Sequence, residues 1–91
     1  MRITEKMLEN LARDINKITE SPDTTYTKNN DGTFTANIGN YHISYAYGGA
    51  ALHRISNEHG GVLDVFYGHM PKRDLYNRMA AWVQGYEMSK Y

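Results

Sequence analysis

The chain has 91 residues, of which 10 are basic and 10 acidic, so its formal net charge is zero, and it contains no cysteine. This length predicts one domain spanning residues 1–91, because so short a chain buries too little surface for two cores. Zero net charge excludes a general electrostatic attraction to nucleic acid or to an anionic membrane. The absence of cysteine excludes disulfides, thiolate metal sites and a cysteine nucleophile.

The chain has no apolar run near the ~20 residues that span a bilayer, and its amino terminus lacks the apolar centre of a signal peptide. We therefore expect no membrane association and a location in the cytoplasm. Tyrosine is unusually frequent, with eight residues. Its apolar ring and polar hydroxyl are common at binding surfaces, so this composition indicates a binding function.

The amino-terminal segment has the pattern of an amphipathic helix. Thr4 is a suitable N-cap, and Glu5 lies where the helix dipole favours a negative charge. Apolar side chains recur at spacings of three and four residues: Met7, Leu8, Leu11, Ile15 and Ile18. We expect the helix to end by Ser21, because Pro22 disfavours helical geometry in the residue before it.

Three strands are predicted next, at residues 26–28, 33–38 and 41–47. The turn signals at 29–32 and 39–40 consist of Asn, Asp and Gly, which tolerate the left-handed backbone of tight turns. In the second strand, alternation places Phe34, Ala36 and Ile38 on one face, which we expect to be the core face. In the third, it places Tyr41, Ile43, Tyr45 and Tyr47 together.

The segment 50–56 is predicted to be a strand, although Ala50, Ala51 and Leu52 also suit a short helix. A turn at 57–61 then leads to a short last strand at 62–66. Pro71 suits the first position of a second helix. Its apolar stripe comprises Leu75, Tyr76, Met79, Trp82, Val83 and Tyr86.

The predicted class is therefore α+β, in the order α-β-β-β-β(-β)-α. We expect an antiparallel meander of four to five strands, flanked by an N-terminal and a C-terminal helix that pack on one face.

No catalytic or metal-binding motif is present. The four histidines, His42, His53, His59 and His69, lack the spacing of a ligand motif. Neither Ser44 nor Ser56 lies in a G-x-S-x-G sequence, and the acidic residues are scattered. We expect no metal, no cofactor and no enzymatic activity.

Two glycine pairs stand out, at 48–49 and 60–61. Either pair suits a hairpin turn, and either lets backbone N–H groups approach an anion closely. Residues 71–91 carry four basic and two acidic side chains, and a helix start favours anions. Tyrosine rings add stacking surfaces for bases. The predicted site for a nucleotide or a phosphate backbone comprises Tyr45, Tyr47, Gly48, Gly49, Arg54, Gly60, Gly61, Lys72 and Arg73. Turns and solvated charges remain the alternative interpretation.

Residues 39–85 contain, in order, GNYH, AYGG, LHRISNEHGGV and PKRDLYNRM. They resemble a family of short, uncharacterised proteins encoded by tailed bacteriophages, and the resemblance covers about half of the chain. It implies a phage accessory protein made in the bacterial cytoplasm.

The expected function is that of a non-enzymatic binder or inhibitor in the host, which sequesters a nucleotide immune signal or blocks a host defence protein. The alternative is nucleic-acid binding through a basic patch of Arg54, Lys72, Arg73 and Arg78, which predicts a steep salt dependence. We also expect a homo-oligomer, because two helices cover one sheet face and tyrosines on the other face would need a partner.

Overall fold

The computed structural model describes residues 2–90. Its first helix, α1, spans Glu5–Ile18 and is capped by Thr4, whose hydroxyl accepts a hydrogen bond from the Met7 amide at 3.1 Å. This bond satisfies one of the free amides at the helix start. Leu8 and Ile15, both from the predicted stripe, are fully buried. The predicted helix is confirmed, and it ends four residues before Pro22.

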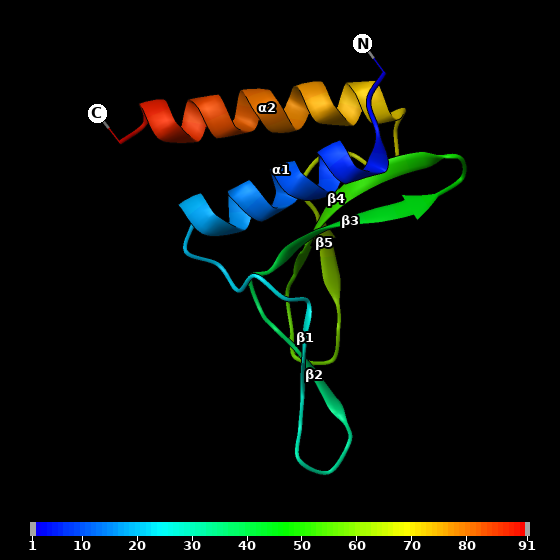
Figure 1. The fold of residues 1–91 in the computed structure, drawn as a ribbon, viewed down its shortest axis with the longest axis vertical. Helices are drawn as coiled ribbons and strands as arrows, with labels where there is room; N and C mark the ends of the chain where they lie inside the picture. Colours follow the sequence, from blue (N-terminus) through cyan, green and yellow to red (C-terminus); the bar gives the residue numbers. More distant parts are fainter. Residues whose placement is uncertain (1, 91) are drawn as a thin grey trace.

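Within residues 2–90, five strands form two antiparallel sheets (Figure 1). In the first sheet, β1 (Tyr26–Lys28) pairs with β2 (Phe34–Ala36). In the second, β4 (Gly49–Ile55) lies between β3 (Tyr41–Ala46) and β5 (Val62–Asp64). The α+β class and the order of the elements are confirmed, and the segment predicted as a strand at 50–56 is the strand β4, at Gly49–Ile55. The prediction of one continuous meander is wrong, because β2 and β3 do not pair.

The second helix, α2, spans Lys72–Met88 and follows Pro71, which occupies the N-cap position rather than the first helical position. Its Leu75 and Met79 are fully buried. Near its other end, the Trp82 ring stacks on Tyr86 and tilts against Tyr41 of β3, with ring centroids 5.4 and 6.0 Å apart. No helix within residues 2–90 combines the length and apolarity needed to cross a bilayer.

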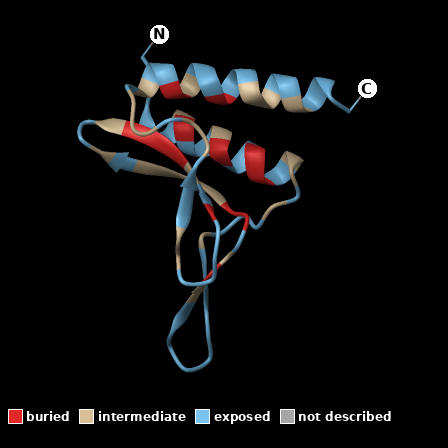
Figure 2. Ribbon diagram, turned by 180° about the vertical axis from the view of Figure 1, so that it is seen from behind, coloured by how far each residue is buried: buried red, intermediate tan, exposed pale blue. Residues whose placement is uncertain are grey.

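Both helices pack on the same face of the second sheet, as predicted. Ala50 and Leu52 of β4 point to this face and join a buried cluster with Leu8 and Ile15 of α1 and Leu75 of α2. In Figure 2, the buried residues concentrate where the helices meet β4. The packing of both helices on this face therefore depends on β4, because the central strand contacts side chains from each of them.

One polar side chain of α1 also belongs to the interior. Asn16 is 3% exposed, and its side-chain amide donates to the Tyr41 carbonyl at 2.9 Å and accepts from the Tyr41 amide at 2.8 Å. An amide side chain carries the same donor and acceptor as a peptide unit. Asn16 therefore takes the place of a neighbouring strand at the start of β3.

The β1–β2 hairpin, residues 25–38, projects away from the helices, and we call it the arm (Figure 1). Its base is fixed by a bond from the Ala36 amide to the Glu58 carbonyl. The prediction that Phe34 and Ile38 belong to the core is wrong, because the arm projects past the core and leaves these side chains 64% and 59% exposed. Ala36, at the base, is buried.

Candidate functional site

The predicted site residues lie in three separate places. Tyr45, Tyr47, Gly48 and Gly49 surround the β3–β4 turn, and Lys72 lies beside this turn at the start of α2. We call this group the hairpin tip. Arg73 follows Lys72 in the first turn of α2 and is exposed. Arg54 lies at the other end of the β3–β4 pairing, and the second glycine pair lies beyond that end.

The hairpin tip is a two-residue turn, since Ala46 pairs with Gly49 across it. Tyr47 and Gly48 both have positive φ, 56° and 73°, which is the type I′ geometry that fits the twist of a hairpin. A tyrosine in the left-handed region is disfavoured by roughly 1 kcal/mol relative to glycine. Because Tyr47 is also 98% exposed, its ring adds nothing to the core and is available for contact with a partner.

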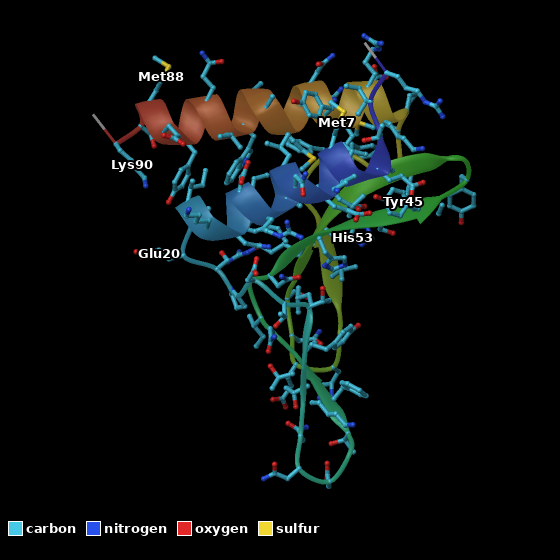
Figure 3. All side chains as sticks on the ribbon, in the orientation of Figure 1. Met7, Glu20, Tyr45, His53, Met88 and Lys90 are labelled. Carbon is cyan, nitrogen blue, oxygen red and sulfur yellow. The ribbon has the colours of Figure 1, made fainter. Side chains whose placement is uncertain are left out.

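The hairpin tip is not strongly positive, although it includes Lys72. The Lys72 ammonium lies 3.5 Å from the Glu5 carboxylate, and the Tyr45 hydroxyl donates to Glu9 at 2.7 Å. Burial, followed by the hydrogen bond and charge of Glu9, raises the pKa of Tyr45 above its ordinary value. Two carboxylates beside the tip disfavour an anionic ligand there. Figure 3 shows Tyr45 near the start of α1.

Gly49 has a structural role at the tip. A Cβ atom at this position would lie 2.8 Å from the Met70 carbonyl oxygen. That carbonyl accepts from the Ala50 amide, and the Met70 amide donates to the Ala50 carbonyl. Glycine therefore allows the segment before α2 to pair closely with the start of β4.

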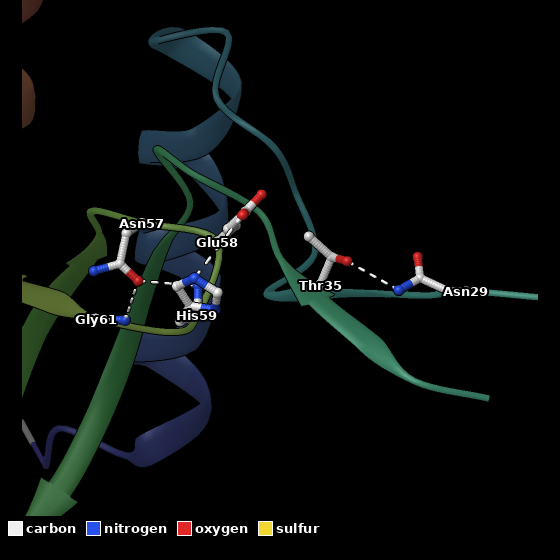
Figure 4. Close-up of polar contacts among 6 residues, drawn as sticks. All are labelled: Asn29, Thr35, Asn57, Glu58, His59 and Gly61. Atoms are coloured by element: carbon white, nitrogen blue, oxygen red, sulfur yellow. Dashed lines mark hydrogen bonds and ion pairs between the residues drawn. The ribbon is translucent and has the colours of Figure 1, made fainter. Parts of the chain in front are cut away.

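The second glycine pair forms an ordinary turn after β4, at the opposite end of this strand from the hairpin tip. The Asn57 side-chain oxygen accepts from the amides of His59 and Gly61, each at 3.0 Å (Figure 4). Gly60 has a φ of 94°, which disfavours a side chain. A Cβ atom at Gly61 would collide with the Asn57 amide. Both glycines are thus accounted for by the turn.

Arg54 is separated from the other predicted cations. It pairs across from Tyr41, at the opposite end of the β3–β4 pairing from Gly49. Its guanidinium lies 5.5 Å from the centre of the Tyr41 ring, a cation–π contact. Arg54 and Lys72 therefore do not form one basic patch.

The sheet face opposite the helices carries a group of side chains that the sequence did not predict. We call it the histidine cluster, and it comprises His42, His53 and His69 with Ser44 and Asp64. In strand register, His42 lies opposite His53, and His53 lies opposite Asp64. The ring centroids of His42 and His53 are 5.7 Å apart, and those of His53 and His69 are 5.8 Å apart. Tyr45 and His53, both labelled in Figure 3, come from the neighbouring strands β3 and β4.

Hydrogen bonds tie the histidine cluster together in two separate pairs. His53 Nε2 lies 2.9 Å from Asp64, and His69 Nε2 lies 3.2 Å from the Ser44 hydroxyl. Because the carboxylate contacts His53 and not His69, these residues do not make a Ser–His–Asp chain. In the described part of the chain, no three His, Cys, Asp or Glu side chains are arranged to hold a metal ion together.

The cluster also shows that one premise of the oligomer prediction is wrong. Alternation places Tyr41 and Tyr45 on the face that the helices cover, with Ile43 and Leu52. The other face presents histidines instead. The sequence held a signal for this arrangement, because a two-residue turn at Tyr47-Gly48 fixes the pairing of His42 with His53.

From the histidine cluster we expect the free energy of unfolding to decrease as the pH falls. Burial, and then the charge of His53, lowers the pKa of His42 below its ordinary value of 6.5. The folded state therefore binds this proton less readily than the unfolded chain, and the stability contributed by neutral His42 is complete above that value and is lost below it. Urea unfolding at about pH 7.5 and about pH 5 measures the effect.

Two variants test whether His42 is the cause. His42→Gln should flatten the pH dependence of the free energy of unfolding. His59→Gln is the matched control, since the His59 side chain is 88% exposed, and it should leave the pH dependence unchanged. An equal fall in stability for wild type and His42→Gln would show that other groups are responsible.

Comparison of the chain with protein family models, with curated proteins and with solved structures gives no match in any of the three.

Proposed function

We propose that this chain is a small phage-encoded accessory protein that acts in the host bacterium by binding a host protein, without catalysing a reaction. The observation that carries the proposal is the exposed aromatic face of the arm. Tyr26 and Phe34 lie on the same face by strand register. They are 52% and 64% exposed. The same face carries Lys28 opposite Phe34. Large apolar side chains exposed together on a projecting element are a common feature of protein–protein contacts.

The two faces of the arm differ in character. On the other face, Thr27 donates to Asn37 at 2.8 Å, and Asn29 donates to Thr33 and Thr35. The Asn29–Thr35 contact is drawn in Figure 4. The polar groups of that face are thus largely engaged with one another. Because an isolated two-stranded hairpin is marginally stable in water, a partner that covers the aromatic face also stabilises the arm.

A photo-crosslinking residue at position 34, with the protein expressed in the host, tests the proposal. The expected result is a discrete adduct with one host protein. The same residue at the exposed position 14 of α1 is the matched control and should give none. The double variant Tyr26→Ser, Ile38→Ser should lose the adduct while its thermal unfolding stays unchanged, because both side chains are exposed.

Two outcomes contradict the proposal. Absence of any adduct from position 34 would remove the arm as a binding surface. An adduct with the mass of two chains would show that a second copy covers the arm, so that the chain is a homo-oligomer and the arm is its interface.

A second candidate, sequestration of a nucleotide signal, has one supporting observation. Tyr45, Gly48, Gly49 and Lys72 line one cavity of about 360 Å³. The neighbouring Glu5 and Glu9 oppose an anion there, so we rank this function second. Calorimetry with cyclic and ADP-ribose-derived nucleotides tests it, and no heat from any of them would remove it.

A further inference from the structure

The outer edge of β3 has backbone groups that no strand of the described chain pairs. The order of the second sheet places β3 at its edge. On β4, the backbone groups of Ala50 bond to Met70, and the Leu52 carbonyl accepts from the Val65 amide. The backbone N–H and C=O groups of Ala50 and Leu52 therefore point away from β3. In an antiparallel pair, the residues opposite them also point outward. Those residues are Tyr45 and Ile43.

The same edge already accepts one amide group. The backbone N–H and C=O of Tyr41, the next outward residue, are both bonded by the Asn16 side chain, at 2.8 and 2.9 Å. Asn16 therefore shows that the outward N–H and C=O of Tyr41 take an acceptor and a donor in strand-like geometry. The positions beyond it along β3, Ile43 and Tyr45, have no such neighbour among the hydrogen bonds of residues 2–90.

A groove of about 260 Å³ lies between α1 and the first half of β3, where Tyr41 and Ile43 line it. Its lining includes Asn40 and His42. In the part of the chain that the structure describes, two buried side-chain atoms lack a hydrogen-bond partner, Asn40 Oδ1 and His42 Nδ1. The His42 ring belongs to the histidine cluster on the other sheet face, so Asn40 Oδ1 is the one that bears on the groove. Asn40 is 1% exposed, so its oxygen has lost access to water and gained no donor. A ligand that supplies an N–H group would remove this cost.

The charges around the groove favour a basic partner. Glu9 and Asp23 contribute carboxylates to its lining, and Arg13 contributes a guanidinium. The groove therefore carries more negative than positive charge at neutral pH, and a lysine or arginine side chain in the ligand complements it.

We propose that the groove beside β3 binds an extended peptide segment of the partner protein, which adds a strand along Ile43 and Tyr45 and carries a basic side chain. This inference rests on the proposed binding function and names the chemistry of the bound segment. Strand addition is a common mode of peptide recognition, in which backbone hydrogen bonds supply affinity and side chains supply specificity.

A synthetic peptide of about seven residues that alternates valine and lysine is a suitable probe. Titration into ¹⁵N-labelled protein should shift the amide signals of Ile43 and Tyr45 and slow their hydrogen exchange by at least about tenfold. Two matched peptides should bind at least about tenfold more weakly. One replaces lysine with glutamate, and the other carries N-methyl groups that remove its backbone donors.

Protein variants provide the second test. Ile43→Pro removes the outward N–H and should abolish binding, since proline is tolerated on an edge strand. Ile43→Ala keeps the N–H and should retain it. If Ile43→Pro does not fold, the N-methyl peptide still decides the question.

Equal binding of the N-methyl peptide, or signal shifts confined to other residues, would overturn the inference. A host-protein adduct at the arm that persists with such a result would leave the proposed function standing. Loss of the adduct itself would instead contradict the function.

Discussion

Replacing Asn16 with alanine is expected to lower the free energy of unfolding by about 2 to 4 kcal/mol. The substitution removes two hydrogen bonds, to the amide and to the carbonyl of Tyr41. Both backbone groups would then stand beside α1 without a partner. Leaving a buried polar group unsatisfied costs about 1 to 3 kcal/mol, and this loss is large for a domain whose total stability is about 5 to 15 kcal/mol.

Asn10→Ala is the matched control for this prediction. It removes the same side chain from the same helix, but Asn10 is exposed and only accepts a bond from Arg13 at 3.3 Å. We expect its effect to stay within about 0.5 kcal/mol. Urea unfolding followed by circular dichroism measures both variants. Equal effects of the two substitutions would show that the Asn16 bonds add no stability.

Asn16 also marks a limit of the sequence. It follows Leu8 and Ala12 at four-residue intervals, so its position on the apolar stripe was visible. The partner of Asn16 could not be predicted. It is Tyr41, at the start of a strand 25 residues away, and no local sequence pattern shows which helix this strand contacts. Helix periodicity predicts a face, whereas the group that meets this face depends on the tertiary fold.

The arm shows the same limit for strands. Alternation correctly separated Phe34 and Ala36 from the polar residues between and around them, but it does not say what covers a face. Ala36 is buried because the 57–61 turn anchors the base of the arm, while Phe34 lies further out and is exposed. The division into two sheets has the same origin, since a tight-turn signal at 39–40 does not specify that the flanking strands pair.

The candidate site was predictable in part. The hairpin tip brings together Tyr45, Tyr47, the first glycine pair and Lys72, which local turn chemistry and the helix start indicated. Arg54 and the second glycine pair lie elsewhere, because each residue along β4 moves the chain further from the tip. The acidic residues Glu5 and Glu9, which change the electrostatics of the tip, come from α1 and had no sequence link to it.

Leu52→Ala is expected to lower the free energy of unfolding by about 2 to 5 kcal/mol. Leu52 is 1% exposed and lies in the buried cluster formed with side chains of both helices. Truncation removes its buried methyl groups and leaves a cavity that α1 and α2 cannot both close, because each is held by its own contacts with the sheet. Denaturant unfolding measures the loss.

Leu63→Ala is the control, since Leu63 lies on the edge strand β5 and is 58% exposed. Its effect should stay within about 0.5 kcal/mol. If Leu52→Ala destabilises the fold as expected, its binding should recover when a stabilising osmolyte restores the folded population. If Leu52→Ala lost no more stability than Leu63→Ala, the packing of the helices on Leu52 of β4 would not stabilise the fold.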